Sequence, residues 1–476
     1  MPFPTPIRRA VATLLCLSLV LPAQAWRTTP LWPEPQLGEP TRPNFNAPSA
    51  LDCRRPVQAR VVPGDRRGQV AADSASIPMT YAPVATPLPV PAPMVTAPAA
   101  MRAEAAKLSE RAAVAAESRI ASPTPAPQRT ESPQASSVVT AGVVDDNADF
   151  NEYLAFRART QVEHRERDVR ERYLLEVKNA AGHAVPDAEV AVRATDGESM
   201  WARTDTAGRV WLHPDAFDKS HAATYDITVR KSGQEVSTQL RRGQKSAVEV
   251  RLDAQPVYPR ARLDLVFLVD ATGSMGDEID KLRSSLQTIV NKIAQAPSRP
   301  DLCLGLVAYR DRVDEFLIKS HDLSNDVPGF QRALNGLKAD GGGDYPEAMN
   351  EALADTVQRI SWRGEGSTRL VILLADAPPH LDYGGTQYDE SMMAALGKGI
   401  KIFSVGASGL DKQGEYIQRQ IAQYTGGRFV FLTYADASRP ESGPGRETVH
   451  DVNNYSVDTL DKLIVRLVTQ ELAALK

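Results

Sequence analysis

The sequence predicts a C-terminal α/β domain whose mostly parallel sheet is covered by helices on both faces. Four almost continuous apolar runs follow residue 260, and segments with a helical apolar period separate them. Strands that are apolar along their whole length are typical of a sheet that is buried on both faces. Strands that alternate with helices predict a doubly wound sheet, whose ligands bind beyond the carboxyl ends of the strands. The four runs are residues 263–269, 302–309, 370–375 and 400–405.

Helical periodicity marks two segments of this domain. Apolar residues recur every three to four positions between residues 275 and 293, and again between residues 457 and 475. We therefore expect one helix directly after the first strand and a final helix that packs on the sheet. The whole domain is expected to cover residues 260–476.

A small all-β sandwich is predicted before this domain, over residues 170–253. Apolar and polar residues alternate there in short runs, and turn-forming residues such as Asp196-Gly197 and Ser232-Gly233 separate the runs. Short strands at this spacing are typical of a β-sandwich. The alternating runs are residues 173–177, 189–193, 225–229 and 248–252.

Three short motifs connect the sandwich to a known family. Val185-Pro186-Asp187-Ala188-Glu189-Val190 is followed by Thr204-Asp205-Thr206-Ala207-Gly208-Arg209 and then by Tyr225-Asp226-Ile227-Thr228-Val229. This order resembles the carboxypeptidase-regulatory-like (prealbumin-like) β-sandwich. The resemblance implies an accessory role as a spacer, with glycan or protein binding by its loops as the alternative.

The N-terminal region reads as an export signal followed by a disordered tether. Arg8 and Arg9 precede a short apolar run, and Ala23-Gln24-Ala25 has the small-x-small form of a cleavage site. We therefore expect a signal peptide over residues 1–25 and a mature chain that begins at Trp26. Of the 35 prolines, 23 precede residue 134, so residues 26–142 are predicted to be a Pro/Ala-rich linker. Residues 143–169 are expected to form a short helical linking segment.

The cysteines are not expected to pair within the chain. Cys53 lies in the predicted linker, whereas Cys303 lies in an apolar strand run. We interpret Cys303 as a small buried hydrophobic residue. Cys53 is expected to be free or to bridge two chains.

Charge and hydropathy exclude two classes of protein. The formal net charge is −4, with +5 on residues 1–140 and −9 on the remainder. This balance disfavours a protein that binds nucleic acid, because such proteins usually carry a strongly basic domain. No apolar run reaches the roughly 20 residues of a membrane-spanning helix, so we expect no transmembrane span in the mature chain. The signal and tether together predict an exported protein, periplasmic or extracellular, of the cell envelope.

Oxygen-bearing side chains gather where three predicted loops meet the carboxyl ends of the strands. Asp270-Ala271-Thr272-Gly273-Ser274 follows the first strand, and Asp376 follows the run at 370–375. Between them, the Gly-rich loop Gly341-Gly342-Gly343-Asp344 opens a helix. Oxygen ligands without His or Cys are typical of a hard cation such as Mg²⁺. Asp277, Asp311 and Asp382, near the same edge, are interpreted as solvated acids.

These three loops, in this order, resemble the metal-ion-dependent adhesion site of von Willebrand factor type A domains. The resemblance implies that Asp270, Thr272 and Ser274 supply ligands from the first loop and Asp376 from the third. The second loop commonly offers a Thr in that family, where this chain has Asp344, which we retain as a ligand. Mg²⁺ is the expected ion, with Mn²⁺ or Ca²⁺ as alternatives.

The resemblance implies a binding function. A protein partner would offer an Asp or Glu to the bound cation, and the alternative is a structural envelope component whose metal only stabilises the fold. An enzyme is not expected. A phosphatase of the haloacid dehalogenase type needs a second Asp at position 272, where this chain has Thr. Sequence signatures of serine hydrolases, zinc proteases and phosphate-binding loops are also absent.

Overall fold

The computed structural model describes residues 42–45, 52–65, 138–254, 260–296, 298–343 and 345–473. All of them belong to one compact unit of the chain. The predicted signal peptide and Asp344 lie outside the described residues. None of the described helices has an apolar stretch long enough to cross a bilayer.

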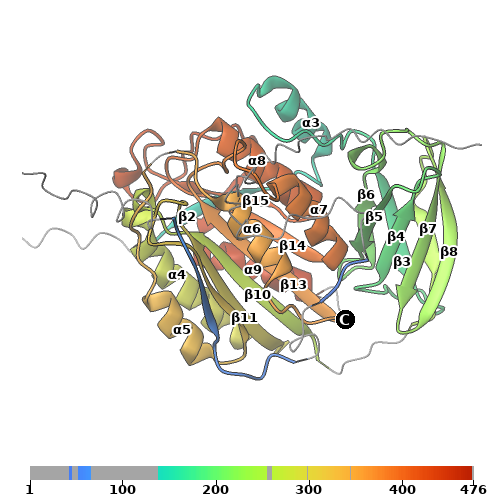
Figure 1. The fold of residues 1–476 in the computed structure, drawn as a ribbon, viewed down its shortest axis with the longest axis horizontal. Helices are drawn as coiled ribbons and strands as arrows, with labels where there is room; N and C mark the ends of the chain where they lie inside the picture. The colour runs from blue at the N-terminus through green and yellow to red at the C-terminus, as the bar shows by residue number, and fades with distance from the viewer. Residues whose placement is uncertain are drawn as a thin grey trace, which may run out of the picture. The chain divides into compact units, whose positions relative to one another are not determined.

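A nine-stranded, mostly parallel sheet forms the centre of the C-terminal domain (Figure 1). Its order is β1-β12-β11-β10-β13-β14-β15-β2-β16, and five adjacent strands, β11, β10, β13, β14 and β15, run parallel to one another. The other four strands pair antiparallel at the two sides of this parallel core. The strands are β1 (Ala59–Pro63), β2 (Thr140–Val144), β10 (Arg262–Asp270), β11 (Asp301–Tyr309), β12 (Phe316–Ser324), β13 (Ser367–Ala375), β14 (Ile400–Gly406), β15 (Phe429–Thr433) and β16 (Ser456–Thr459).

Helices cover both faces of this sheet, as a doubly wound fold requires. On one face, alternate residues of β10 share a buried core with α4, α5 and α9. On the other face, α6 packs on β10 and β11, whereas α7 and α8 pack on β14. The helices are α4 (Gly276–Ala294), α5 (Val327–Asn335), α6 (Met349–Gln358), α7 (Tyr388–Lys398), α8 (Lys412–Tyr424) and α9 (Leu460–Ala473). The last helix begins at Leu460 and not at 457, because residues 456–459 pair with β2.

The N-terminal tract contributes two strands to the sheet, which differs from the expectation of a linker over residues 26–142. β1 pairs with β12, and β2 inserts between β15 and β16. Most of β1 is exposed to solvent. An edge strand of this kind is held by backbone hydrogen bonds. Because these bonds do not depend on the side chains, its sequence shows little apolar pattern.

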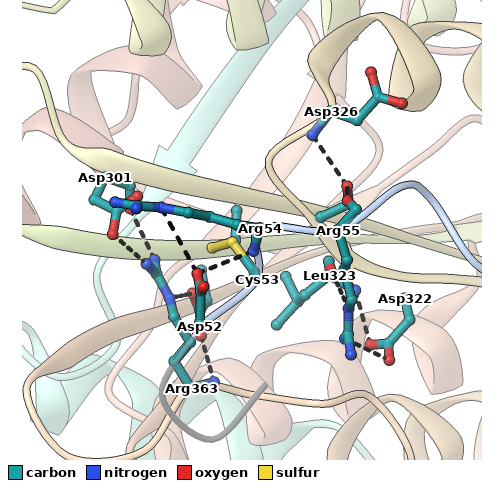
Figure 2. The surroundings of a disulfide bond; sticks show 12 residues. Asp52, Cys53, Arg54, Arg55, Asp301, Asp322, Leu323, Asp326 and Arg363 are labelled. Carbon is teal, nitrogen blue, oxygen red and sulfur yellow. Dashed lines mark hydrogen bonds and ion pairs between the residues drawn. A yellow bond between two sulfur atoms is a disulfide. The ribbon is translucent and has the colours of Figure 1, made fainter. Parts of the chain in front are cut away.

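The expectation that the cysteines stay unpaired is wrong. Cys53 and Cys303 form a disulfide, with their Cα atoms 6.2 Å apart and 250 residues between them (Figure 2). Both cysteines are buried. β1 pairs with β12, and β12 pairs with β11, which carries Cys303. Cys53, which precedes β1, therefore lies beside the end of β12, where its carbonyl oxygen accepts a hydrogen bond from Asn325 near the start of β11. The sequence did not indicate this pairing, because the contact between the two cysteines depends on the order of the strands in the sheet.

A β-sandwich precedes the α/β domain. One sheet has the order β6-β3-β9 and the other β5-β4-β7-β8, and side chains from both share one buried core. Ser232 and Gly233 connect β7 to β8 with positive φ angles, as a tight hairpin turn needs. The resemblance of this sandwich to the prealbumin-like family stays a prediction. The strands are β3 (Tyr173–Lys178), β4 (Glu189–Arg193), β5 (Ser199–Arg203), β6 (Arg209–Leu212), β7 (Thr224–Lys231), β8 (Gln234–Arg241) and β9 (Val248–Arg251).

The sandwich packs directly on the α/β domain. Met392 and Leu396 of α7, with Tyr416 and Tyr424 of α8, belong to the same apolar core as the sandwich. The linking segment contains helix α3 (Phe150–Arg159), which lies against α8 through Phe156. The sandwich is therefore an integral part of the described unit.

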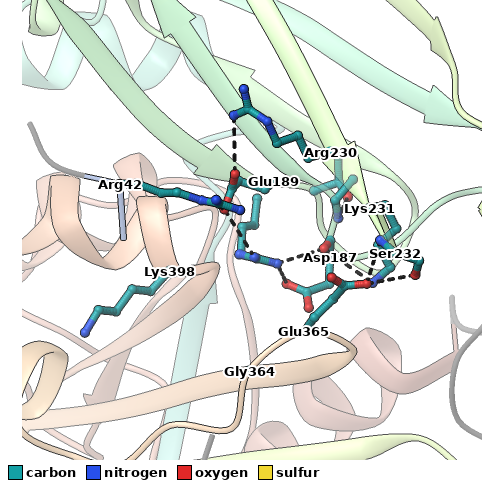
Figure 3. A network of polar contacts seen from close by, with 12 residues as sticks. Arg42, Asp187, Glu189, Arg230, Lys231, Ser232, Gly364, Glu365 and Lys398 are labelled. Atoms are coloured by element: carbon teal, nitrogen blue, oxygen red, sulfur yellow. Dashed lines mark hydrogen bonds and ion pairs between the residues drawn. The ribbon is translucent and has the colours of Figure 1, made fainter. Parts of the chain in front are cut away.

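A buried network of charges joins the same two parts of the chain (Figure 3). Asp187 of the sandwich is 3.0 Å from Arg203 and 3.0 Å from Arg369 of β13. Its other carboxylate oxygen accepts a hydrogen bond from the amide of Gly366. Burial by itself would raise the pKa of Asp187, but Arg203, Arg369 and Lys231 outweigh it and hold the pKa well below its usual value. Asp187 therefore remains charged inside the protein.

Candidate metal centre

Asp270 ends the central strand β10 and is fully buried. Its Oδ1 accepts hydrogen bonds from the amide nitrogen of Thr272, at 3.0 Å, and from the Thr272 hydroxyl, at 2.7 Å. The Thr272 hydroxyl is in turn 3.1 Å from the hydroxyl of Ser274. The tight turn after β10 thus brings the three predicted first-loop ligands together.

Asp376 follows β13, the neighbour of β10 in the sheet. Two buried carboxylate oxygens, Oδ2 of Asp270 and Oδ1 of Asp376, make no hydrogen bond of ordinary geometry with the described residues. The hydroxyls of Tyr309 and Ser274 nevertheless lie near enough to lower the pKa of Asp270 and Asp376, respectively, but less than burial raises it. Burial raises the pKa of Asp270, and the charge of Asp376 raises it further. Burial also raises the pKa of Asp376. Two buried carboxylates of this kind are suited to bind a cation, because a buried negative charge needs a positive partner.

The second loop lies directly on the first. The amide nitrogen of Gly273 donates a 2.9 Å hydrogen bond to the carbonyl oxygen of Gly341. Gly342 has a positive φ of 69°, and a Cβ atom added to it would be 3.1 Å from the Cβ of Thr272. Only glycine fits this close approach without strain. Asp344, the predicted ligand of this loop, lies two residues further on and outside the described residues.

Sequence reasoning missed two buried carboxylates at this end of the sheet. Glu278, in the first turn of α4, accepts hydrogen bonds from the amide of Ser408 and the hydroxyl of Tyr434. Burial raises the pKa of Glu278 to about 7. Glu347 is also buried, and its Oε1 would be 2.9 Å from a Cβ atom on Gly342. The position of Glu278 four residues after Ser274, one helical turn away, is a signal that could have identified it.

One of the acids expected to be solvated is buried. Asp311 is 1% exposed, and its carboxylate is 3.6 Å from the Nε2 of His380. Asp382 is exposed, in agreement with the prediction. Asp311 lies in the β11–β12 loop, which Asp314 links to Gly342 of the Gly-rich loop.

A second group of acids lies in the sandwich. Asp196, Glu198 and Asp218 approach one another closely enough to share a cation. Asp218, however, already accepts hydrogen bonds from Ser220, Ala222 and Tyr225. Burial would raise its pKa, but these hydrogen bonds outweigh burial and lower the pKa to about 2. The described contacts thus give Asp218 a structural role.

A family model matches the part of the chain that carries the candidate site. The model of the von Willebrand factor type A domain matches residues 264–438. This part of the chain is a VWA domain. The match begins inside β10 and ends after β15, so it contains all three loops that converge at the candidate site. The sandwich and the N-terminal strand β1 lie outside the matched residues.

Two relatives match part of this chain. The chain is 31% identical over 146 residues to Alpha-protein kinase vwkA of Dictyostelium discoideum, which covers 30% of this chain and 22% of that protein. It is 25% identical over 195 residues to human Integrin beta-4, which covers 34% of this chain and 10% of the integrin. This chain therefore spans less than a quarter of either relative. VWA domains suggest a role in protein interaction or adhesion.

Proposed function

We propose that this protein binds a protein partner through a divalent cation held by the VWA domain. Asp270, Thr272 and Ser274 would hold the ion together with Asp376 and Asp344. Mg²⁺ is the proposed ion, with Mn²⁺ or Ca²⁺ as alternatives. A cation with an open coordination position supplies a point of attachment for an Asp or Glu carboxylate of the partner. The role is binding and not catalysis.

The pair of unsatisfied carboxylate oxygens on Asp270 and Asp376 is the observation that carries this proposal. Both oxygens are buried at the carboxyl ends of neighbouring parallel strands, which is where ligands of doubly wound folds bind. Ser274 is an exposed residue whose hydroxyl is 3.1 Å from that of Thr272, and it gives the site access to solvent. A purely structural carboxylate pair would be expected to have its oxygens satisfied.

Partner capture with and without EDTA tests the proposal. The full chain, immobilised in Mg²⁺, is expected to retain a partner from the native envelope, and EDTA is expected to release it. Asp344→Thr, which restores the hydroxyl that is commoner in the family, should weaken Mg²⁺ binding but strengthen capture of an acidic partner. The reason is that one carboxylate fewer leaves more charge on the ion. Capture that survives EDTA while the fold persists would favour the structural alternative, in which the metal only stabilises the protein.

We also propose that the protein is exported to the periplasm or beyond. The Cys53–Cys303 disulfide supports this, because stable disulfides form mainly in oxidising compartments. The sequence of the first 25 residues predicts cleavage after Ala25. Mass spectrometry of the protein from its native source should find Trp26 at the N-terminus. A retained Met1, or a lipid on Cys16, would contradict export by this route.

A further inference from the structure

Residues 52–65, here called the strap, run along the whole length of β12. The carbonyl oxygen of Cys53 accepts a hydrogen bond from Asn325 at one end, just after β12. Ala59 to Pro63 then pair antiparallel with residues 316–321. At the other end, the amide of Asp65 donates a 2.5 Å hydrogen bond to the carbonyl oxygen of Arg312. The strap thus connects the disulfide to the loop between β11 and β12.

Strong contacts fix the strap in place although most of its side chains are exposed. The disulfide holds its first part, and Arg55 binds Asp322 and the carbonyl oxygen of Leu323 (Figure 2). Further along, Arg60 donates to both carboxylate oxygens of Asp355 at 2.6 Å. Asp355 is fully buried, so loss of the strap would leave a buried carboxylate without this counter-ion.

The end of the strap is in close contact with the β11–β12 loop. A Cβ atom on Gly64 would overlap the backbone carbonyl oxygen of Asp314. Asp314 is buried, and its Oδ2 accepts hydrogen bonds from the amide of Asp311, at 3.0 Å, and from the amide of Gly342, at 2.9 Å. Gly342 belongs to the second loop of the candidate metal centre. Asp314 therefore links the second loop of the candidate metal centre to the β11–β12 loop, which the strap contacts.

We propose that the strap and Asp314 position the second loop of the metal centre, with Asp314 as the positioning residue and the disulfide as its distant anchor. This inference rests on the proposed metal site. The strap lies outside the residues that match the VWA family model, so the cation affinity of this VWA domain depends on a segment from elsewhere in the chain. Positioning groups behind metal ligands typically change metal affinity by about 10–100-fold.

Calorimetric titration of the full chain with Mg²⁺ tests the inference. Asp314→Ala is expected to weaken Mg²⁺ binding by about 10–100-fold. Gly64→Ala, which forces the strap away from the loop, and Cys53→Ala combined with Cys303→Ala should each weaken it by about tenfold. Val61→Ala is the matched control, because Val61 lies in the same strap but is 54% exposed. It should leave the affinity unchanged.

The outcomes separate this inference from the proposed function. Variants with lowered melting temperatures but the Mg²⁺ affinity of the wild type would show that the strap only stabilises the fold, and would overturn the inference. A wild-type chain that takes up no Mg²⁺ would overturn the proposed metal site, and the inference with it. Amide exchange of the wild-type chain provides a second measurement that needs no variant. Since coupling between sites is reciprocal, Mg²⁺ should slow exchange in residues 59–65, and unchanged exchange there would contradict the coupling.

Discussion

Replacing Asp187 by Asn is expected to lower the free energy of unfolding by about 3–5 kcal/mol, because buried cations then lose their shared counter-ion. Arg203 and Arg369 are both buried and both contact this carboxylate. Asn is the sharpest substitution, since Asp187 has a φ of 54° and Asn tolerates this left-handed conformation. The variant thus removes the charge without adding backbone strain. Urea denaturation followed by circular dichroism measures the effect.

Two further variants make this test specific. Asp226→Asn changes an exposed carboxylate of the same sandwich and should alter the stability by no more than about 0.5 kcal/mol. Arg369→Met in the Asp187→Asn background should cost less than the sum of the two single changes, because the orphaned cation is removed. Equal stability of Asp187→Asn and Asp226→Asn would show that the network does not hold the sandwich on the VWA domain.

The stability that this network contributes is expected to decrease in acid. The pKa of Asp187 is lower in the folded protein than in the unfolded chain. Its contribution to stability is therefore complete above the unfolded pKa of about 3.9 and is lost as the pH falls through the folded value. The difference between the wild type and Asp187→Asn should accordingly disappear only in strong acid.

Asp270→Asn is expected to abolish Mg²⁺ binding and yet to stabilise the metal-free protein. In EDTA, the substitution removes the repulsion between Asp270 and Asp376 and should raise the free energy of unfolding by about 1–2 kcal/mol. In Mg²⁺ at one hundred times its Kd, the wild type should gain about 2.7 kcal/mol that the variant does not. The order of the two melting temperatures should therefore reverse between EDTA and Mg²⁺.

Asp280→Asn is the matched control, because Asp280 lies on the neighbouring helix α4 and its side chain is 79% exposed. It should melt like the wild type in both conditions. A wild type whose melting temperature and calorimetric titration show no response to Mg²⁺ would refute the site assignment, leaving the VWA fold untouched.

Protons should compete with the metal at this site. The pKa of Asp270 is raised in the metal-free protein by burial and by Asp376, and cation binding requires the deprotonated carboxylate. Mg²⁺ affinity is therefore expected to fall as the pH is lowered from about 8 to about 6. Because the folded protein holds this proton more tightly than the unfolded chain, the stability of the metal-free form should decrease as the pH rises. The stabilisation by Mg²⁺ should consequently be largest at the higher pH.

The core of the VWA domain could be predicted from the sequence. The apolar run at 263–269 became β10, Arg262–Asp270, and the run at 302–309 became β11, Asp301–Tyr309. A strand buried on both faces needs apolar residues along its whole length, so the residues of the strand themselves indicate where it lies. The loops after such strands are local as well, so the sequence alone predicts that Asp270 and Thr272 lie together, and they form a 2.7 Å hydrogen bond.

The contacts that depend on strand order could not be predicted. β1 is a largely exposed strand with little apolar pattern, and nothing near Cys53 in the sequence points to a partner 250 residues away. Glu347 likewise becomes part of the site only through the tertiary fold, which places its carboxylate against Gly342, whereas Glu278 had a local signal, because it lies one helical turn after Ser274.

Asp187 illustrates the same division within a single residue. By sequence it belongs to a turn motif before a strand, and its positive φ agrees with a turn. Only the packing of the sandwich on β13 makes it the counter-ion of Arg369. The sequence by itself thus determined the long apolar strands β10, β11, β13 and β14, the helices α4 and α9, and the loops with ligand chemistry, because these follow from periodicity and neighbouring residues. The tertiary structure alone decided which distant segments hold those loops in place, because such contacts depend on how the sheet is ordered and on what packs against it.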